Sequence, residues 1–227
     1  MLQGAFAPGI HCAAMDTLSL RERKKLRTRQ ALVDTALRRF AEDGFDATTL
    51  DDLCAEVEVS KRTFFRYFTS KEDVGLAPAH DLWTAFLDEL RTREPDHGTL
   101  LELLQDTLLT CLARMPEDGW AERAAASCRL SAITPSMTAH GLQFCDRTTR
   151  AAIALLQERF GFAEHDLRVR LALDLLVAAF HCALERWTFQ RGPASRDDLA
   201  TDLRAAFAAV PGSVTLDLSA ASAPDPR

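Results

Sequence analysis

The sequence predicts an all-α protein of about nine helices, with an N-terminal three-helix helix-turn-helix head and a C-terminal helical body. Apolar residues recur at the three-to-four-residue period of an amphipathic helix, and no window alternates like a strand. Capping boxes at Ser19–Glu22 and Thr99–Glu102, and stop signals at Gly44 and Gly161, mark helix ends. The predicted helices span 20–43, 50–57, 61–67, 70–90, 99–115, 120–133, 136–160, 166–191 and 195–210.

Composition places the chain among globular proteins. Of its 227 residues, 47% are hydrophobic and 26% are charged, and its net charge is −6 at pH 7. An acidic chain is a poor candidate for a general nucleic-acid coat protein. The longest apolar run near the C-terminus, 175–180, is too short to cross a membrane, so we expect no membrane association.

We expect a cytoplasmic protein. Residues 1–15 lack the basic segment of a signal peptide, and translation could start at Met1 or at Met15. The six cysteines form no CxxC pair, which favours free thiols in a reducing compartment.

Residues 49–68 have the layout of a helix-turn-helix, in which helix 50–57 and turn 58–60 lead into helix 61–67. Five apolar residues are spaced to clamp the two helices: Leu53, Val57, Val59, Phe64 and Phe68. The first residues of the second helix, Lys61, Arg62 and Thr63, are then free to enter a DNA major groove. Between positions 21 and 29, six basic residues stand against one glutamate, which suits phosphate neutralisation.

Three motifs, RQALV (29–33), FAEDGFDATTL (40–50) and VSKRTFFRYFTSKED (59–73), resemble the DNA-binding segment of TetR-family repressors. The resemblance covers about residues 20–77. It implies phosphate or backbone contacts from one set of side chains, namely Thr48, Thr49, Thr63, Arg66, Tyr67 and Lys71. It implies base contacts from Lys61, Arg62 and Phe65. Glu58 stands where the family usually has glycine, so we expect a strained turn and a negative charge near the DNA.

The predicted domains are a disordered extension (1–18), the DNA-binding domain (19–77), a ligand-binding and dimerisation domain (78–210) and a disordered tail (211–227). The resemblance implies that the third domain forms dimers through its last two helices. Candidate interface residues are Leu171, Leu175, Ala178, Ala179, Cys182, Leu199, Leu203, Ala206 and Phe207. Ordinary core packing explains the same pattern equally well.

The same domain could hold a mainly apolar ligand with one or two polar groups. Candidate pocket residues are Trp83, Phe86, Leu87, Cys111, Trp120, Arg123, Met137, His140, Phe144, Phe180 and His181. Most such residues at helical spacing belong to a core, so the sequence leaves both interpretations open. Arg123, His140 and His181 stand out because a polar group on an apolar face needs a partner.

We therefore predict a homodimeric transcriptional regulator, in the family's manner a repressor, which a small ligand releases from a palindromic operator. Its partners are double-stranded operator DNA, a second copy and the small effector. We expect no cofactor, no metal and no enzyme activity, because phosphate-loop, HExxH and GxSxG motifs are absent from the sequence. The alternative is a thiol redox sensor on the same scaffold, because Cys111, Cys128, Cys145 and Cys182 fall on different predicted helices.

Overall fold

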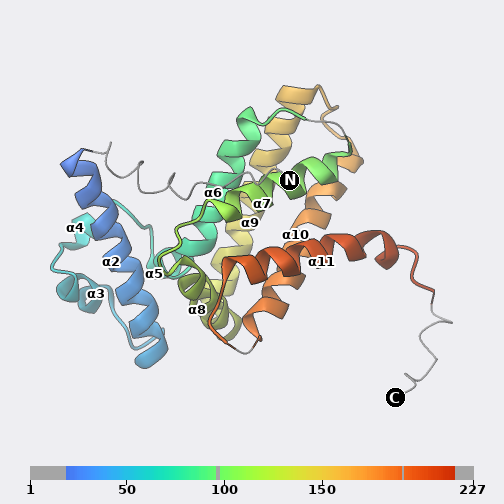
Figure 1. Cartoon of the computed structure of the whole chain (residues 1–227). Coiled ribbons are helices and arrows are strands. Elements are labelled where there is room, and N and C mark those ends of the chain that lie inside the picture. Colours follow the sequence, from blue (N-terminus) through green and yellow to red (C-terminus); the bar gives the residue numbers. More distant parts are fainter. Residues whose placement is uncertain (1–18, 96–97, 191, 218–227) are drawn as a thin grey trace, which may run out of the picture. The chain divides into compact units, whose positions relative to one another are not determined.

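The computed structural model describes residues 19–95, 98–190 and 192–217. Within these ranges it contains ten helices and no strand, which confirms the all-α prediction (Figure 1). The chain divides into two compact units, with the first ending at Val74 and the second beginning at Gly75. The predicted N-terminal extension, and the tail from position 218, lie outside the described residues.

The first unit contains α2 (Leu20–Glu42), α3 (Leu50–Glu56) and α4 (Lys61–Phe64), and α5 (Lys71–Gly75) crosses its end. Side-chain caps start each of the first three helices. Ser19 and Thr49 each form a reciprocal capping box, and Ser60 accepts the backbone N–H of Thr63. These caps matter most for α3 and α4, which are too short to be stable on their own.

Two predicted helix boundaries are wrong in the first unit and just after it. α4 ends at Phe64 rather than at position 67, and residues 65–67 continue as a turn. The predicted helix 70–90 is two helices, α5 and α6 (Ala77–Thr92), with a break at Leu76. Pro78 lies in the first turn of α6, where its missing N–H removes no helical hydrogen bond, so the chain restarts a helix there.

A small apolar core holds the first unit together. α2 contributes its buried stripe, α3 contributes Leu53, and α4 with the turn behind it contributes Phe64 and Phe68. Phe64 is fully buried and its ring lies 5.7 Å from that of Phe68. The aromatic pair thus anchors α4 and the following turn in the core of the first unit, as the spacing in the sequence predicts.

In the described residues, the second unit consists of α6 and five further helices. These are α7 (Leu100–Ala113), α8 (Trp120–Ile133), α9 (Pro135–Phe160), α10 (Leu167–Thr188) and α11 (Arg196–Ser213). α10 packs against α7, α8, α9 and α11, while α6 packs against α7, α8 and α9. The capping box at Thr99 and the left-handed glycine after Phe160 occur as predicted.

α11 extends to Ser213, past the predicted end at Val210 and into the segment assigned to the tail. Pro211 stands inside its last turn, where proline's fixed φ suits the helix but the missing N–H removes the hydrogen bond to the carbonyl of Phe207. None of the helices described here is long and apolar enough to span a membrane.

Candidate DNA-binding surface and ligand cavity

The turn between α3 and α4 sets the geometry of the helix-turn-helix. The backbone N–H of Glu58 donates to the carbonyl of Ala55 at 3.2 Å, and that of Val59 donates to the carbonyl of Cys54 at 2.9 Å. These two bonds form a Schellman motif, which requires a left-handed residue at position 58. Glu58 has φ of +54°, the one positive value at a non-glycine position among the described residues. The expected strain at Glu58 is therefore present in the structure.

α4 exposes one face and buries the other. Lys61, Arg62 and Phe65 are solvent-exposed, whereas Phe64 is buried. The Phe65 ring is 53% exposed, an unusual position for a large apolar side chain. Lys61 forms an exposed ion pair with Asp51, with 2.9 Å between Nζ and the carboxylate. The three side chains predicted to meet base edges thus share one accessible surface.

The next residues along this surface are partly engaged with one another. The Thr63 hydroxyl lies 3.0 Å from that of Ser60. The Arg66 guanidinium lies over the Tyr67 ring at 5.1 Å and donates to its hydroxyl at 3.4 Å. These exposed or half-buried groups remain accessible to a phosphate backbone.

Thr48 and Thr49 differ sharply although they are neighbours. Thr49 is exposed and caps α3, with its hydroxyl 2.6 Å from the Asp52 carboxylate. Thr48 is 3% exposed, and its hydroxyl donates to the carbonyl of Gly44 at 2.9 Å. The side chain of Thr48 is thus part of the turn before α3 rather than of the surface.

Lys71 is held within the first unit. Its ammonium donates to the carbonyls of Phe45 and Thr48, each at 2.6 Å, and lies 4.4 Å from the centre of the Phe45 ring. Two of the three N–H groups are therefore used to tie α5 to the turn before α3. The third N–H takes part in neither of these two bonds.

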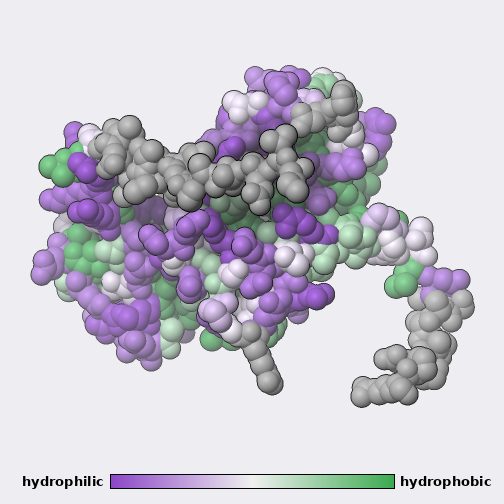
Figure 2. Space-filling model, viewed as in Figure 1, coloured by the Kyte–Doolittle hydropathy of each residue, from purple (hydrophilic) through white to green (hydrophobic). Residues whose placement is uncertain are grey.

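A charged cluster joins α2 to α3. The Glu56 carboxylate accepts from Arg39 at 2.7 Å and also from Arg38. Hydrogen bonds from Arg39 and then Arg38 lower the pKa of the Glu56 carboxyl. The basic stretch at the start of α2 is largely exposed, and the viewed surface over this unit is mostly hydrophilic with scattered hydrophobic patches (Figure 2).

The second unit contains a cavity of about 790 Å³, lined mainly by α6, α8, α9 and α10. This volume is in the range of pockets that hold drug-sized molecules. The predicted pocket residues that line it are Trp83, Phe86, Phe144, Phe180 and His181. Trp83 meets Phe86 and Phe180 edge to face, with ring centres 5.2 and 5.0 Å apart. An aromatic cluster thus forms one wall.

The other predicted pocket residues do not line this cavity. They are Leu87, Cys111, Trp120, Arg123, Met137 and His140. Cys111 and Met137 are buried in packed interior, and the Trp120 indole donates to the carbonyl of Pro78. Arg123 donates to the carbonyl of Asp118 at 2.8 Å, in the turn before α8.

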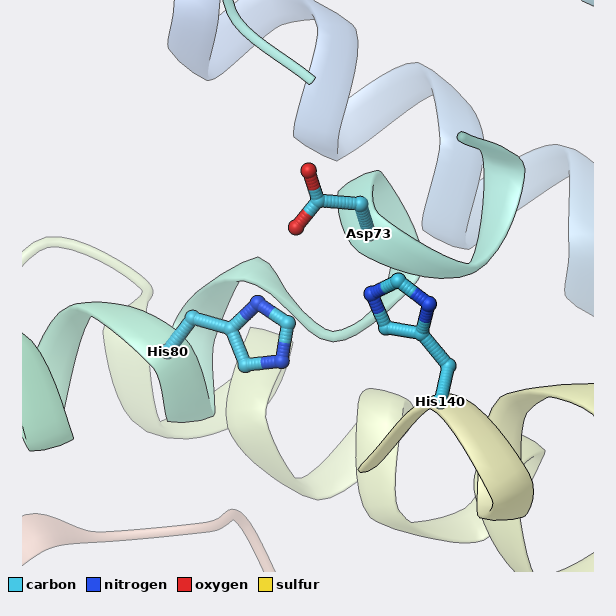
Figure 3. Close-up of side chains that lie close together, drawn as sticks. All are labelled: Asp73, His80 and His140. Atoms are coloured by element: carbon cyan, nitrogen blue, oxygen red, sulfur yellow. The ribbon is translucent and has the colours of Figure 1, made fainter. Parts of the chain in front are cut away.

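Two histidines lie together at the edge of this site, His80 from α6 and His140 from α9 (Figure 3). Their ring centres are 5.9 Å apart. His80 stacks on Phe144 at 3.8 Å and lines the cavity. Asp73, drawn in the same figure, belongs to the first unit, where its carboxylate accepts from the backbone and hydroxyl of Thr69.

Several cavity residues were not anticipated from the sequence, including Thr148, Thr149, Cys128 and Cys145. Their spacing on α8 and α9 is that of any inward-facing helix stripe, so the sequence holds no signal that separates them from core.

The cysteines are free thiols among the described residues. Burial raises the pKa of Cys111 to about 11. Burial also raises the pKa of Cys128 and Cys145, both in the cavity wall. All three are protonated at neutral pH, the form that reacts poorly with peroxide.

The candidate dimer residues fall into two groups. Ala179, Leu199, Leu203 and Phe207 are buried where α10 packs on α11 within one chain, so core packing explains them. By contrast Leu171 is 57% exposed, Ala178 and Cys182 are exposed, and Leu175 and Ala206 are partly exposed.

Comparison with known proteins identifies the first unit. Residues 32–77 match the family described as "Bacterial regulatory proteins, tetR family". The HTH-type transcriptional regulator TcmR of Streptomyces glaucescens is 32% identical over 174 residues, which cover 74% of this chain and 76% of TcmR. The negative transcriptional regulator IcaR of the biofilm operon icaADBC in Staphylococcus epidermidis is 28% identical over 74 residues, covering 33% of this chain and 40% of IcaR.

Solved structures share the fold of most of the chain. A structure from Syntrophomonas wolfei, described as that of a TetR-family transcriptional regulator, aligns with a TM-score of 0.54 at 18% identity, covering 84% of this chain and 98% of that one. The SmeT–triclosan complex aligns with a TM-score of 0.50 at 21% identity, covering 81% and 91%. The matched family and relatives are regulators rather than enzymes, which confirms the expected absence of enzyme activity. The chain belongs to the TetR family of bacterial transcriptional regulators.

Proposed function

We propose that the protein is a homodimeric repressor that binds a palindromic operator through α4 and is released by a small, mainly apolar ligand. The exposed face of α4, fixed from behind by the buried Phe64 ring, is the observation that carries the proposal. TcmR and IcaR are named as transcriptional regulators, and their similarity to this chain supports the same role. Since the target is chromosomal DNA, we propose that the protein acts in the cytoplasm.

In the proposed complex Lys61, Arg62 and Phe65 meet base edges, and the Arg62 guanidinium pairs with a guanine. Phosphate and sugar contacts come from the remaining accessible residues, Thr49, Thr63, Arg66, Tyr67 and the third N–H of Lys71. We leave Thr48 out, because its hydroxyl is buried and bonded to Gly44.

Dimerisation is proposed through the outer faces of α10 and α11. Leu171, Leu175, Ala178 and Cys182 recur at spacings of four, three and four residues, which makes one apolar stripe along α10. α11 presents small exposed residues at Ala205 and Ala208, which permit close approach of a second helix. A two-fold dimer doubles the base contacts, as a palindromic operator requires.

The cavity of the second unit is the proposed effector site. SmeT is seen in complex with triclosan, a small molecule. By linkage, a ligand releases DNA only if it binds the DNA-free conformation more tightly than the DNA-bound one. The proposed DNA-free conformation no longer matches the half-site spacing.

The thiol-sensor alternative has less support. A peroxide-sensing cysteine needs a thiolate at neutral pH, whereas burial raises the pKa of Cys111, Cys128 and Cys145. Cys182 is exposed but lies on the proposed dimer stripe. We therefore expect DNA binding to survive moderate peroxide treatment.

A gel shift with the DNA upstream of the protein's own gene tests the proposal, at two salt concentrations and with and without peroxide. We expect a complex that weakens steeply with salt.

Arg62→Ala should relax the base preference at one position of each half-site, at a cost of about 1–3 kcal/mol. Arg91→Ala, an exposed arginine of the second unit, is the matched control and should bind like the wild type. Full base selectivity in Arg62→Ala would remove this residue from base recognition.

A further inference from the structure

Most polar side chains in the cavity wall already bond within the protein. The Ser127 hydroxyl donates to the carbonyl of Gly75 at 2.6 Å, and Thr188 donates to the carbonyl of Leu184 at 2.6 Å. Thr138 donates to the carbonyl of Ser131 at 2.7 Å, and Thr149 bonds the Cys145 thiol. The polar atoms of these side chains are therefore already hydrogen-bonded within the protein rather than to a ligand.

Three cavity side chains without a formal charge differ from this pattern. The imidazole of His181 on α10 and the hydroxyls of Thr148 on α9 and Ser131 on α8 line the cavity and make no hydrogen bond to any residue that the structure describes. His181 is solvent-exposed, and the two hydroxyl side chains are half-buried. A polar group that lines an apolar cavity offers a ligand a hydrogen bond in place of the one that it makes to water. His181 and Thr148 lie on the packed helices α10 and α9, so one polar group of a ligand can reach both of them.

The rest of the lining is apolar or aromatic. Trp83, Phe86, Phe144 and Phe180 contribute flat surfaces, and aliphatic side chains of α9 and α10 fill the spaces between them. The formally charged lining residues are Arg129 and Glu185, whose side chains are solvent-exposed. Among the described lining residues, no carboxylate is buried in the wall.

We propose that the cavity selects uncharged, planar polycyclic aromatic compounds that carry a hydroxyl or carbonyl group, and that His181 and Thr148 are the residues that bind this group. The inference rests on the proposed function, because it concerns the same effector site. It adds to that function the ligand's chemistry and the two residues that determine specificity.

Burial lowers the pKa of His181, so its imidazole is neutral at pH 7. A neutral imidazole has one donor and one acceptor nitrogen, and can therefore bond either a phenol or a carbonyl. The same cavity disfavours organic cations. Aromatic faces attract a cation by about 0.5–2 kcal/mol, which is less than the cost of taking an unpaired charge out of water. The carboxylate of Glu185 lines the cavity but is exposed to solvent, which screens its attraction for a cation.

Three fluorescent probes of one shape test the proposal: pyrene, 1-hydroxypyrene and 1-pyrenemethylamine, which is a cation at pH 7. Fluorescence titration of the full-length wild type should show 1-hydroxypyrene binding about fivefold more tightly than pyrene, the effect of one or two neutral hydrogen bonds. The cation should bind at least about tenfold more weakly than 1-hydroxypyrene.

His181→Phe keeps an aromatic ring and removes both nitrogens. We expect it to bind pyrene as before and to lose most of the preference for 1-hydroxypyrene. His181→Gln, which keeps a donor and an acceptor, should retain part of the preference, and Thr148→Val should reduce it. His165→Phe, at an exposed histidine outside the cavity, is the matched control. Val177→Trp fills the cavity and should weaken all three probes. Circular dichroism melts check that each variant folds.

Three results would overturn the proposal: no binding of any probe, tighter binding of the cation, or a hydroxyl preference that survives in both His181→Phe and Thr148→Val. Gel shifts on the same preparations show whether only the proposed ligand chemistry fails or the proposed function fails as well. Intact DNA binding without probe binding rejects the ligand chemistry alone. A His181-dependent preference without release of DNA supports the ligand chemistry and rejects effector-driven release.

Discussion

The two units of the protein stabilise their helices in different ways. In the first unit, α3 and α4 span seven and four residues, and caps, a charged cluster and the ammonium of Lys71 hold them around a small core. In the second unit, α7 to α11 span 14 to 26 residues and pack through long apolar faces. Short helices depend on contacts with neighbouring residues for their conformation. Long helices remain stable even where a cavity leaves part of their surface unpacked.

This difference suits the proposed roles. A DNA-reading surface must hold several side chains at fixed positions, which dense polar and aromatic contacts provide. An effector site must leave space and must permit more than one arrangement of its walls. The cavity of about 790 Å³ in the second unit provides that space, and the contacts around α4 provide the rigidity.

The strongest test of the comparison removes the aromatic anchor of the first unit. Phe64→Ala deletes a fully buried ring from a small core and should destabilise this unit by about 3–5 kcal/mol, with loss of DNA binding. Phe65→Ala is the neighbouring control, because its ring is 53% exposed and should affect stability by less than about 1 kcal/mol. Hydrogen–deuterium exchange of peptides from α2 to α4, with urea titration, measures both. Equal stability losses in the two variants would contradict the anchor role of Phe64.

The first unit was largely predictable from the sequence because its signals are local. Ser19, Thr49 and Ser60 cap the first three helices, and each stands immediately before a helix start that the sequence predicts. The positive φ of Glu58 follows from the position of the turn. The internal contacts of Thr48 and Lys71 were not predictable, because each depends on carbonyl groups that only the folded chain brings within reach.

The second unit shows where periodicity stops being informative. Leu171 and Leu203 belong to the same kind of apolar stripe, yet Leu171 is exposed and Leu203 is buried. Met137 and Phe144 lie on the same helix, yet Phe144 alone of the two lines the cavity. Apolar residues at helical spacing indicate which face of a helix is apolar. They do not indicate whether that face packs in the core, lines a cavity or binds a partner. Three-dimensional packing is needed to distinguish them.

A second test concerns Lys71, the polar tie of the first unit. Lys71→Met keeps the apolar stem and removes the ammonium that the carbonyls of Phe45 and Thr48 accept from, so we expect a loss of about 1–3 kcal/mol in the stability of this unit. The salt dependence of DNA binding should also flatten by about one unit of slope if the third N–H meets a phosphate.

Lys61→Met is the control for Lys71→Met. Its ammonium forms an exposed ion pair with Asp51, so its removal should change stability by less than about 1 kcal/mol while weakening DNA binding. Urea titrations and gel shifts at several salt concentrations measure the two effects. A Lys71→Met variant as stable as Lys61→Met would show that the internal hydrogen bonds contribute little, and an unchanged salt slope would remove Lys71 from the phosphate contacts.

The smallest expected change in stability is at Glu58, where two variants separate the effect of charge from that of backbone strain. Glu58→Gly relieves a left-handed backbone conformation, partly offset by the greater freedom of glycine in the unfolded chain, so we expect a gain of about 0.5–1 kcal/mol in the stability of the first unit. It also removes a carboxylate beside the proposed DNA surface, which should tighten DNA binding at low salt. Glu58→Gln separates the two causes, because it removes the charge and keeps the strain. The glutamine variant should match the glycine variant in DNA binding and the wild type in stability. If both variants gained equal stability, the charge of Glu58 rather than its backbone conformation would be what destabilises the first unit. The positive φ of Glu58 would then not indicate a strained turn.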